Sequence, residues 1–352
     1  MPQIDYLRTG VIKSVWGSVD LFVKPLLPPS VPREGKTMTM TTTTTPATPG
    51  AIAGNAGTGT GTADARIAVV DSAIKGISHI ATLPEITLKI IELVEDPSST
   101  AQDLHKVIAN DPALCSRILK VVNSAFYGLP RQIGSINRAI VLLGLNAVKN
   151  IAIAASLTKL FRGGDLCPRF SARDLWIHSM ATAAGSKLIC DNLKLGLPDE
   201  AFLAGLIHDI GIMVEMQAHK DKLVKVFEEI KFDPNGVATS DMREIEQRII
   251  GADHTQFGTG LCEAWKFPKS FSHVAGHHHD PLQLPAGNRM LASIVYVADR
   301  LAAQCKYGFR ADIQNTDINP AVCDELCMNA VSLQAITNTL PGMFEDVQAT
   351  FG

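Results

Sequence analysis

Residues 201–211, Ala-Phe-Leu-Ala-Gly-Leu-Ile-His-Asp-Ile-Gly, place two ionisable side chains inside an apolar stretch. Apolar residues such as Phe202 and Leu206 recur there with the spacing of a helix that buries one face. His208 and Asp209 interrupt that face, although burying a carboxylate costs several kcal/mol unless it is paired or bound to a metal. Successive helical residues point about 100° apart, so both side chains could reach one ion. A hydrogen-bonded core pair and a metal site are both consistent with this stretch alone.

Two glycines flank the His-Asp pair, at Gly205 and Gly211. Glycine has no Cβ, so another helix or a ligand can approach the backbone closely at these positions. We therefore expect this stretch to lie in close contact with a neighbouring element.

The whole chain has the composition of a globular protein. Its 352 residues are enough for about two domains, and its net charge of −3 gives no general attraction to nucleic acid or anionic membranes. No apolar run approaches the ~20 residues that span a bilayer, and the N-terminus does not resemble a secretory signal. The seven cysteines are scattered and lack zinc-finger spacing, which favours reduced thiols and a cytoplasmic location.

The N-terminal part differs from the rest in composition. Residues 1–36 contain apolar side chains such as Val15 and Trp16 but end in several prolines, which predicts a loosely ordered tail, with a short amphipathic helix as the alternative. Residues 37–65 are rich in Thr, Gly, Ala and Pro. Such a segment buries too little apolar area to offset chain entropy, so we predict a disordered linker.

From Arg66 onward the sequence predicts helices joined by short turns, without the alternation typical of strands. We predict an all-α fold with an N-terminal helical lobe, 66–165, packed on a second helical lobe, 166–303, and further helices packing on the second lobe over 304–352. Several helix starts carry a capping side chain: Thr100 with Asp103, Asp111 before Pro112, and Ser171 with Asp174.

The N-terminal lobe carries an excess of basic residues. A solvated basic face is one interpretation, and a nucleic-acid-binding lobe is the other, although no helix dense in Arg, Asn and Gln is present. The basic residues between positions 97 and 150 are Lys106, Arg117, Lys120, Arg131, Arg138 and Lys149.

The second lobe sets imidazoles and carboxylates into its apolar helices. Each would need its own hydrogen-bond partner if no metal were bound. A donor set of imidazole and carboxylate without cysteine favours Fe, Mn, Mg or Zn, and this many donors could hold two ions about 3.5–4 Å apart, an arrangement suited to phosphate ester hydrolysis. The candidate ligands are His178, His208, Asp209, His254, His278, His279 and Asp299.

Further motifs occur in a fixed order around these candidates: 82–85 (Thr-Leu-Pro-Glu), 111–114 (Asp-Pro-Ala-Leu), 123–128 (Asn-Ser-Ala-Phe-Tyr-Gly), 142–144 (Leu-Leu-Gly), Trp176 with His178, 201–211, Asp253-His254, 278–281 (His-His-Asp-Pro) and 298–300 (Ala-Asp-Arg). In this order they resemble the HDOD domain, the HD-related output domain of bacterial signalling proteins, within 66–303.

The resemblance implies an all-helical fold in which an N-terminal lobe packs on an HD-type lobe, and a regulatory role exerted through partner signalling proteins. It also implies a divalent metal, Fe or Mn ahead of Mg or Zn, as one ion, two ions or none. A nucleotide or cyclic dinucleotide is the ligand class that it suggests. A homodimer is one option for the oligomeric state.

The enzymes that most resemble this lobe are the HD-GYP phosphodiesterases, which hydrolyse cyclic di-GMP. Residues matching their metal positions are present, but Ile212 stands where those enzymes carry a phosphate-contacting Lys. The sequence Asp-Pro-Leu-Gln-Leu, 280–284, replaces their Gly-Tyr-Pro loop. A missing cation removes stabilisation where charge develops during hydrolysis. The departures favour a binding module over a cyclic di-GMP phosphodiesterase.

Three functional hypotheses follow. The first is an HDOD-type regulatory module whose second lobe binds metal, a nucleotide, or both. The second is an active metal-dependent phosphohydrolase, with Asp209 in a catalytic role and Lys220 or Arg300 replacing the missing cation. In the second hypothesis a first ion is held by His178, His208, Asp209 and Asp299, and another by His254, His278 and His279. The third is a nucleic-acid-binding regulator that uses the basic N-terminal lobe.

Overall fold

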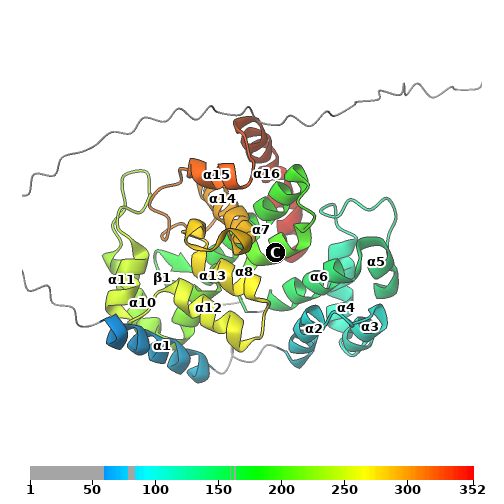
Figure 1. Ribbon diagram of the computed structural model, residues 1–352, viewed down its shortest axis with the longest axis horizontal. Helices are drawn as coiled ribbons and strands as arrows, with labels where there is room; N and C mark the ends of the chain where they lie inside the picture. Colours follow the sequence, from blue (N-terminus) through cyan, green and yellow to red (C-terminus); the bar gives the residue numbers. More distant parts are fainter. Residues whose placement is uncertain (1–58, 78–83, 159, 162–163) are drawn as a thin grey trace, which may run out of the picture. The chain divides into compact units, whose positions relative to one another are not determined.

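Helices make up nearly all of the regular structure in this protein, which confirms the all-α prediction (Figure 1). The predicted tail and most of the predicted linker lie outside the described residues. The structure, a computed structural model, describes residues 59–77, 84–158, 160–161 and 164–352.

Helices begin where the capping side chains predict them. The Thr100 hydroxyl accepts a hydrogen bond from the Asp103 amide, and the Asp103 carboxylate accepts one from the Thr100 amide, which completes a capping box. Asp111 caps the next helix with Pro112 at its first position. Ser171 accepts from the Asp174 amide at the start of the first helix of the second lobe.

The N-terminal lobe consists of short helices around α6. Helix α6 contacts α2, α4 and α5, and it also contacts α8 of the second lobe. Its core contains fully buried residues such as Ile90, Leu104 and Val148. The helices of the lobe are α2 (Glu85–Glu95), α3 (Ala101–Ala109), α4 (Pro112–Val122), α5 (Ile136–Leu143) and α6 (Leu145–Leu157).

Helix α1 (Gly59–Gly76) differs from the prediction in two respects. It starts inside the predicted linker, and it packs on α9 and α12 of the second lobe instead of joining the N-terminal lobe. Its contact with α12 is close, because an added Cβ at Gly260 would lie 2.6 Å from Val70. The composition of 37–65 predicts a linker, but this tertiary packing stabilises a helix from residue 59.

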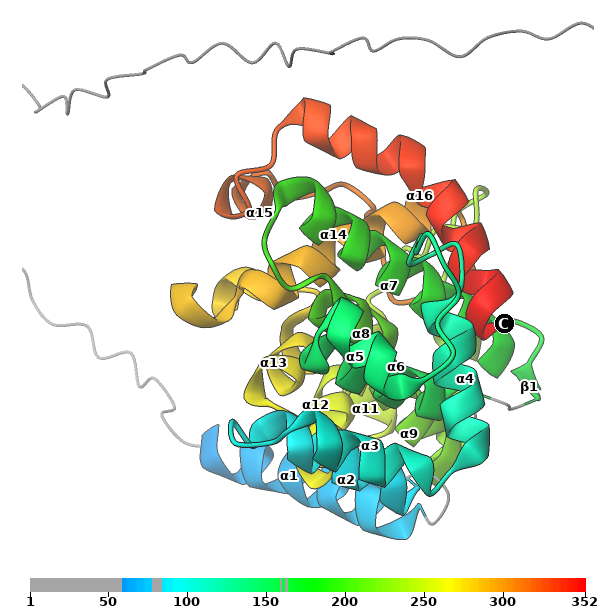
Figure 2. The same cartoon turned by 90° about the vertical axis from the view of Figure 1, so that its right-hand side faces the viewer.

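The second lobe is organised around the long helix α7, which packs on α8, α14 and the C-terminal α16 (Figure 2). A two-stranded antiparallel hairpin precedes α7, and its strands are too short to show a sequence pattern. The elements are β1 (Asp165–Cys167), β2 (Phe170–Ser171), α7 (Ala172–Leu193), α8 (Pro198–Ile207), α9 (Ile210–Ala218), α10 (Lys220–Glu229), α11 (Met242–Ile249), α12 (His254–Ala264), α13 (Lys269–His277), η1 (Pro281–Gln283), η2 (Ala286–Asn288) and α14 (Met290–Gln304). After them come α15 (Pro320–Glu325) and α16 (Ala330–Phe351).

The predicted helix through the His-Asp pair is interrupted at the pair itself. Asp209 has φ −97° and ψ 18°, outside the helical region, and it separates α8 from α9. The His208 ring nitrogen Nδ1 donates to the Gly205 carbonyl at 2.8 Å, which satisfies a carbonyl of the last turn of α8. The prediction that both side chains project from one continuous helix is therefore wrong, and the bend directs the Asp209 carboxylate independently of the His208 ring.

Neighbouring helices occupy the space that both glycines leave. An added Cβ at Gly205 would lie 2.8 Å from the Thr182 carbonyl oxygen of α7. At Gly211 it would lie 1.8 Å from the His254 carbonyl oxygen of α12. The expected close approach is confirmed, and it brings α7 and α12 against the His-Asp bend.

One stretch, 198–218, is long and apolar enough to cross a membrane by length and composition, contrary to the sequence-based expectation. It comprises α8 and α9, and 83% of its most apolar part is buried inside the protein. These helices form part of the protein core, and apolar length alone is weak support for a membrane span.

Candidate metal centre

The structure brings all of the predicted ligands together in the middle of the second lobe. They come from α7, the α8–α9 bend, the start of α12, the end of α13 and α14. All are buried, and His279 is the most exposed of them at 7%. The predicted ligands are His178, His208, Asp209, His254, His278, His279 and Asp299.

The first group of ligands lies between α7, α14 and the α8–α9 bend. Nε2 of His178 is 2.9 Å from Oδ1 of Asp299, and Nε2 of His208 is 3.8 Å from the same oxygen. Oδ2 of Asp209 lies 3.2 Å from Nε2 of His208. These four residues are the ones that the sequence assigns to the first ion.

The second group lies on the other side of Asp209. Oδ1 of Asp209 is 3.2 Å from Nε2 of His278 and 4.0 Å from Nε2 of His254. Nε2 of His254 is 3.0 Å from Nε2 of His279. One donor atom from each of these residues, and one from Asp312, all lie within 4.8 Å of one another. Asp209 therefore presents one oxygen to each group.

Hydrogen bonds from the far side orient three of the imidazoles. Nδ1 of His208 donates to a backbone carbonyl, Nδ1 of His278 donates to the Ala275 carbonyl at 3.1 Å, and Nδ1 of His254 donates to the Glu246 carboxylate at 2.8 Å. A proton on Nδ1 leaves the Nε2 lone pair free, and in all three rings Nε2 faces the cluster. This is how imidazoles are held in metal sites.

Several buried atoms of the cluster have no hydrogen-bond partner among the described residues. Leaving such atoms unpaired costs free energy, and native proteins rarely do so without a ligand or ordered water. The atoms are Nε2 of His208 and of His278, both carboxylate oxygens of Asp209, Oδ2 of Asp299 and both carboxylate oxygens of Asp312.

The charges of the cluster are strongly interdependent. Burial opposes a charge on His208, yet the neighbouring Asp209 carboxylate raises the pKa of the ring to about 9. Burial also opposes a charge on His254, and Glu246 raises the pKa of this ring to about 10. Burial lowers the pKa of His278. The carboxylates thus stabilise positive charge in the middle of the cluster. A bound metal cation would supply this charge, as protons on the imidazole rings also do.

Asp312 is a ligand candidate that the sequence did not reveal. It lies in the irregular segment after α14, and its Oδ2 is 3.7 Å from Nε2 of His279. Burial, together with the charges of Asp209 and Asp299, raises the pKa of its carboxyl to about 7. Neither a helical period nor a motif distinguishes this aspartate in the sequence.

Glu246 and Glu215 were also missed. Glu246 lies on the apolar face of α11 beside Met242 and Ile245, a pattern that could have marked it. It accepts hydrogen bonds from the backbone nitrogen and the ring of His254. Burial, and then the Glu246 charge, raise the pKa of Glu215 well above its usual value.

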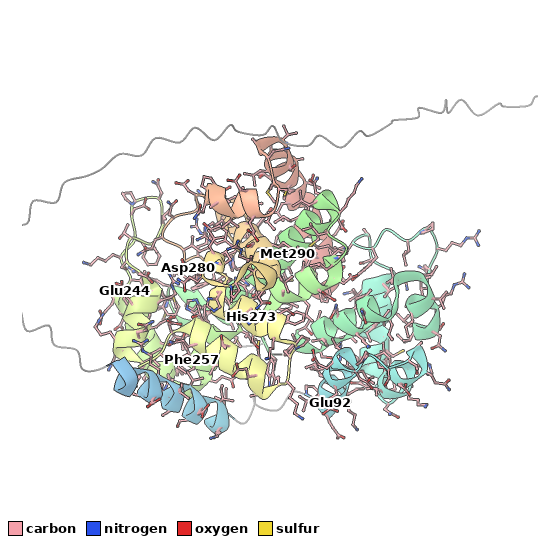
Figure 3. The ribbon with its side chains drawn as sticks, in the orientation of Figure 1. Glu92, Glu244, Phe257, His273, Asp280 and Met290 are labelled. Atoms are coloured by element: carbon pink, nitrogen blue, oxygen red, sulfur yellow. The ribbon has the colours of Figure 1, made fainter. Side chains whose placement is uncertain are left out.

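The structure distinguishes between the two proposed replacement cations. Arg300 lies beside the first group, with Nη1 3.9 Å from Oδ2 of Asp299, and its guanidinium stacks on Tyr296. Lys220 is exposed at the start of α10. Ile212 is fully buried, and Asp280, labelled in Figure 3, forms an ion pair with Arg243 at 2.7 Å.

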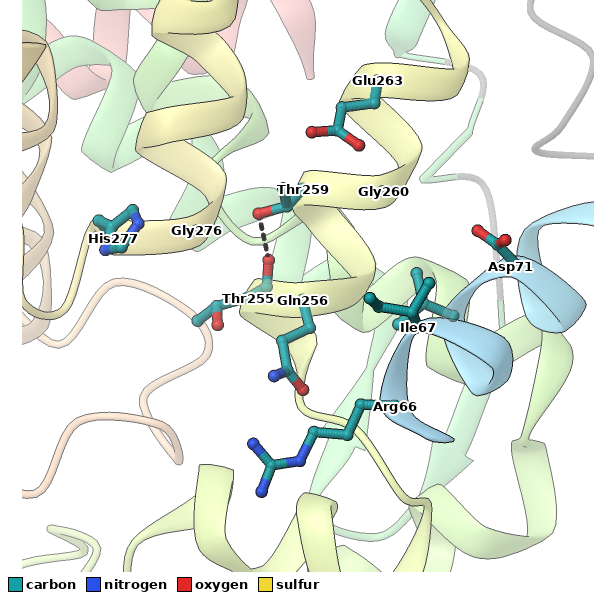
Figure 4. Close-up of a pocket in the computed structure, with 11 residues that line it drawn as sticks. Arg66, Ile67, Asp71, Thr255, Gln256, Thr259, Gly260, Glu263, Gly276 and His277 are labelled. Carbon is teal, nitrogen blue, oxygen red and sulfur yellow. Dashed lines mark hydrogen bonds between the residues drawn. The ribbon is translucent and has the colours of Figure 1, made fainter. Parts of the chain in front are cut away.

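A cavity of about 470 Å³ lies outside the cluster, between α1, α12 and α13 (Figure 4). Its lining includes Arg66, Gln256, Glu263 and His277, and none of the candidate ligands. Thr255 is part of the lining and follows His254 in sequence, and its hydroxyl donates to the Asp253 carboxylate at 2.6 Å.

The donor set fits a divalent ion. It offers imidazole nitrogens and carboxylate oxygens without a thiolate, which suits Fe, Mn and Zn, whereas Mg²⁺ prefers oxygen ligands. The buried His/Asp cluster could therefore hold a metal ion.

Comparison with solved structures supports the fold. An HDOD domain protein of unknown function from Geobacter sulfurreducens aligns over 80% of this chain and 99% of its own, with 21% identity and a TM-score of 0.61. A protein from Shewanella amazonensis named "Putative phosphohydrolase" aligns over 81% of this chain and 98% of its own, with 20% identity and a TM-score of 0.62. A protein from Marinobacter aquaeolei named "Putative signal transduction protein" aligns over 82% of this chain and 65% of its own, with 21% identity and a TM-score of 0.64. At these identities the likeness shows the fold alone.

Sequence comparison identifies the family. An uncharacterized protein from Treponema pallidum is 25% identical over 227 residues, which cover 63% of this chain and 42% of that protein. The HDOD domain model matches residues 80–281, more than half of the chain. With the helical fold and the buried His/Asp cluster in the expected order, this match shows that the chain belongs to the HDOD domain family.

Proposed function

We propose that this protein is a regulatory HDOD module whose second lobe holds a divalent metal centre and transmits its state to partner signalling proteins. This proposal depends on the buried ligand atoms that lack a hydrogen-bond partner among the described residues. A cation at their centre would satisfy these nitrogens and oxygens together. All seven cysteines are outside disulfide bonds, which is compatible with a cytoplasmic location, a further part of the proposal.

The candidate ligands form two groups, and each group could hold one ion. His178, His208 and Asp299 face one position, and the two oxygens of Asp209 face different groups. The bound ions would neutralise the buried carboxylates and link the helices that supply the ligands. We propose Fe or Mn, because the many imidazoles disfavour Mg²⁺, with Zn as the next choice.

Burial of the ligands favours a binding role over catalysis. All candidate ligands are between 0% and 7% exposed, so a phosphate ester has little access to the centre. The buried Ile212 provides no cation for a phosphate. Phosphohydrolase activity stays the alternative, since Arg300 lies beside the first group and its Nε has no hydrogen-bond partner in the described part of the chain.

Basic residues of the N-terminal lobe give little support to nucleic-acid binding. Lys149 is buried, and Lys106 lies 3.6 Å from the Asp103 carboxylate. These two residues therefore add little to a basic surface of the kind that binds nucleic acid. We therefore propose proteins, with a nucleotide as a further ligand class, as the partners of this module.

Elemental analysis tests the metal centre. Protein purified aerobically and anaerobically with Fe or Mn should contain about one to two ions per chain. Asp209→Asn should lose most of this metal because Asp209 belongs to both groups, whereas Asp221→Asn, at an exposed aspartate of α10, should retain it. A wild-type content below about 0.2 ions per chain in every preparation would overturn the proposal.

A turnover assay separates the regulatory module from the enzyme. Metal-loaded wild type should leave nucleotides, cyclic dinucleotides and generic phosphodiesters unchanged. Metal-dependent hydrolysis that Asp209→Asn abolishes would favour the phosphohydrolase. The Asp221→Asn variant serves as the control for contaminating hydrolases, because it passes through the same purification.

A further inference from the structure

The segment that follows α14 is fixed firmly against the start of α7. Gly308 has a positive φ of 64°, and an added Cβ there would lie 2.2 Å from the Asp174 carbonyl oxygen. The next amide, of Phe309, donates to the same carbonyl at 3.1 Å. No residue with a side chain could replace Gly308 without moving the segment, so its path is tightly determined.

An aromatic side chain anchors the same segment over the first group of ligands. The Phe309 ring packs against Phe170 and Phe227, with centroid distances of 5.4 and 6.0 Å. It also faces the His178 ring edge-on at 6.5 Å. The segment therefore lies directly over the metal centre, and Asp312 follows within one turn of chain.

Asp312 turns its carboxylate inward from this segment. The side chain is fully buried, and both oxygens lack a hydrogen-bond partner among the described residues. Within that same part of the chain, the His279 ring is the only basic group within 4.0 Å of the carboxylate. An isolated buried carboxylate costs several kcal/mol, so a cation bound beside it would remove a large penalty.

On the basis of the proposed metal centre, we infer that Asp312 is a further ligand of the second ion position. Through this ligand, metal binding holds the segment 306–319 against the second lobe and fixes the position of the C-terminal helices. The donor atoms of Asp209, His254, His278, His279 and Asp312 already converge within 4.8 Å. The family match ends at residue 281, so this ligand lies in a part of the chain that the family model does not cover.

The segment leads directly to α15 and α16, which pack on the second lobe. Helix α15 contacts α14, and α16 contacts α7. The Tyr296 hydroxyl accepts a hydrogen bond from the Asn319 amide at 3.2 Å, and Arg289 pairs with Glu325 at 2.7 Å. The Asp312–ion bond would add a direct link from the metal centre to the polar and apolar contacts that hold this part of the chain. The C-terminal helices would then be the element that reports metal occupancy to a partner.

The Asp312→Asn variant tests this role with two readouts besides activity. Wild type should bind about two ions of Mn²⁺ per chain, and Asp312→Asn should bind one fewer, or bind the second at least tenfold more weakly. Hydrogen exchange of the amides in 306–319 should slow on adding Mn²⁺ to wild type and change little in the variant. Asp317→Asn, an exposed aspartate of the same segment, should behave as wild type in both measurements.

Thermal unfolding distinguishes a ligand from an ordinary structural residue. Without metal, Asp312→Asn should unfold at the same or a higher temperature than wild type, because it removes a buried acidic group whose oxygens have no hydrogen-bond partner among the described residues. With Mn²⁺ it should gain less stabilisation than wild type. If Asp312→Asn fails to fold, Asp312→Ala provides the same comparison without a buried amide.

Two negative outcomes have different meanings. Unchanged ion content and unchanged metal-dependent protection in Asp312→Asn would overturn the role of Asp312 and leave the metal centre intact. A wild-type protein that binds no Mn²⁺, Fe or Zn would overturn both the metal centre and the inference built on it.

Discussion

A cluster of buried polar residues in the N-terminal lobe and another in the second lobe, both within the described residues, differ in how their hydrogen bonds are satisfied. In the N-terminal lobe, Lys149 of α6 is 2% exposed. Its ammonium group donates to the Leu93 carbonyl in the last turn of α2 and to the Ser99 hydroxyl at 2.6 Å. A cation at a helix C-terminus is favourable in itself, so this cluster is explained by the fold alone.

The cluster of the second lobe lacks this local explanation. Both oxygens of Asp209 and Nε2 of His278 have no hydrogen-bond partner among the described residues, although their neighbours lie within 4 Å. Burial of a polar residue is thus a poor sign of function, because Lys149 is more buried than the candidate ligand His279. Unsatisfied and convergent donor atoms are the stronger sign.

The largest expected effect is that of Gly211→Ala, which would damage the second cluster through the backbone. The new Cβ would lie 1.8 Å from the His254 carbonyl oxygen, so α9 and α12 must move apart and carry His254 with them. We expect a loss of about 3 kcal/mol or more in the free energy of unfolding, measured by denaturant titration, together with loss of bound metal. Gly134→Ala, where no atom lies within 4 Å, should change neither quantity. Normal stability and metal content in Gly211→Ala would contradict this packing.

Lys149→Met should affect stability and leave metal binding unchanged. Methionine retains an apolar stem, but it removes the ammonium group that donates to the Leu93 carbonyl and the Ser99 hydroxyl. The Leu93 carbonyl keeps the hydrogen bond from the Ser99 hydroxyl at 2.8 Å. Hydrogen bonds from a charged donor contribute about 1–3 kcal/mol each, so we expect a loss of about 2 kcal/mol in the free energy of unfolding. Lys120→Met, at an exposed position of α4, is the matched control. A fall in the metal content of Lys149→Met would show that the two clusters are coupled.

Local sequence patterns account for the parts of the fold that could be predicted from the sequence. The caps at Thr100, Asp111 and Ser171 are local patterns, and each one starts a helix in the structure. The candidate ligands were identified because polar residues in apolar helices are conspicuous in sequence. Lys149 shows the limit of this approach, since the sequence placed it on a basic face and the structure buries it.

Non-local contacts account for what the sequence did not predict. The bend at Asp209 depends on the ring of His208 and on the approach of α12 to Gly211. Asp312 reaches the cluster only because Gly308 and Phe309 fix the preceding chain against distant elements. Neither feature follows from residue spacing along one helix.

The smallest expected effect concerns Glu246, which acts on the centre through His254. The Glu246 carboxylate accepts a hydrogen bond from Nδ1 of His254 at 2.8 Å, which keeps the Nε2 lone pair directed at the second group. Glu246→Leu should therefore weaken Mn²⁺ binding by about tenfold or more, measured by calorimetric titration. Glu246→Gln keeps an oxygen acceptor and should stay much closer to wild type. If both variants weaken binding equally, the charge of Glu246 matters and the orientation of the ring does not. If neither variant weakens Mn²⁺ binding, the packing around His254 alone orients its ring. The cluster of the second lobe would then resemble the Lys149 cluster, because the fold would determine its geometry.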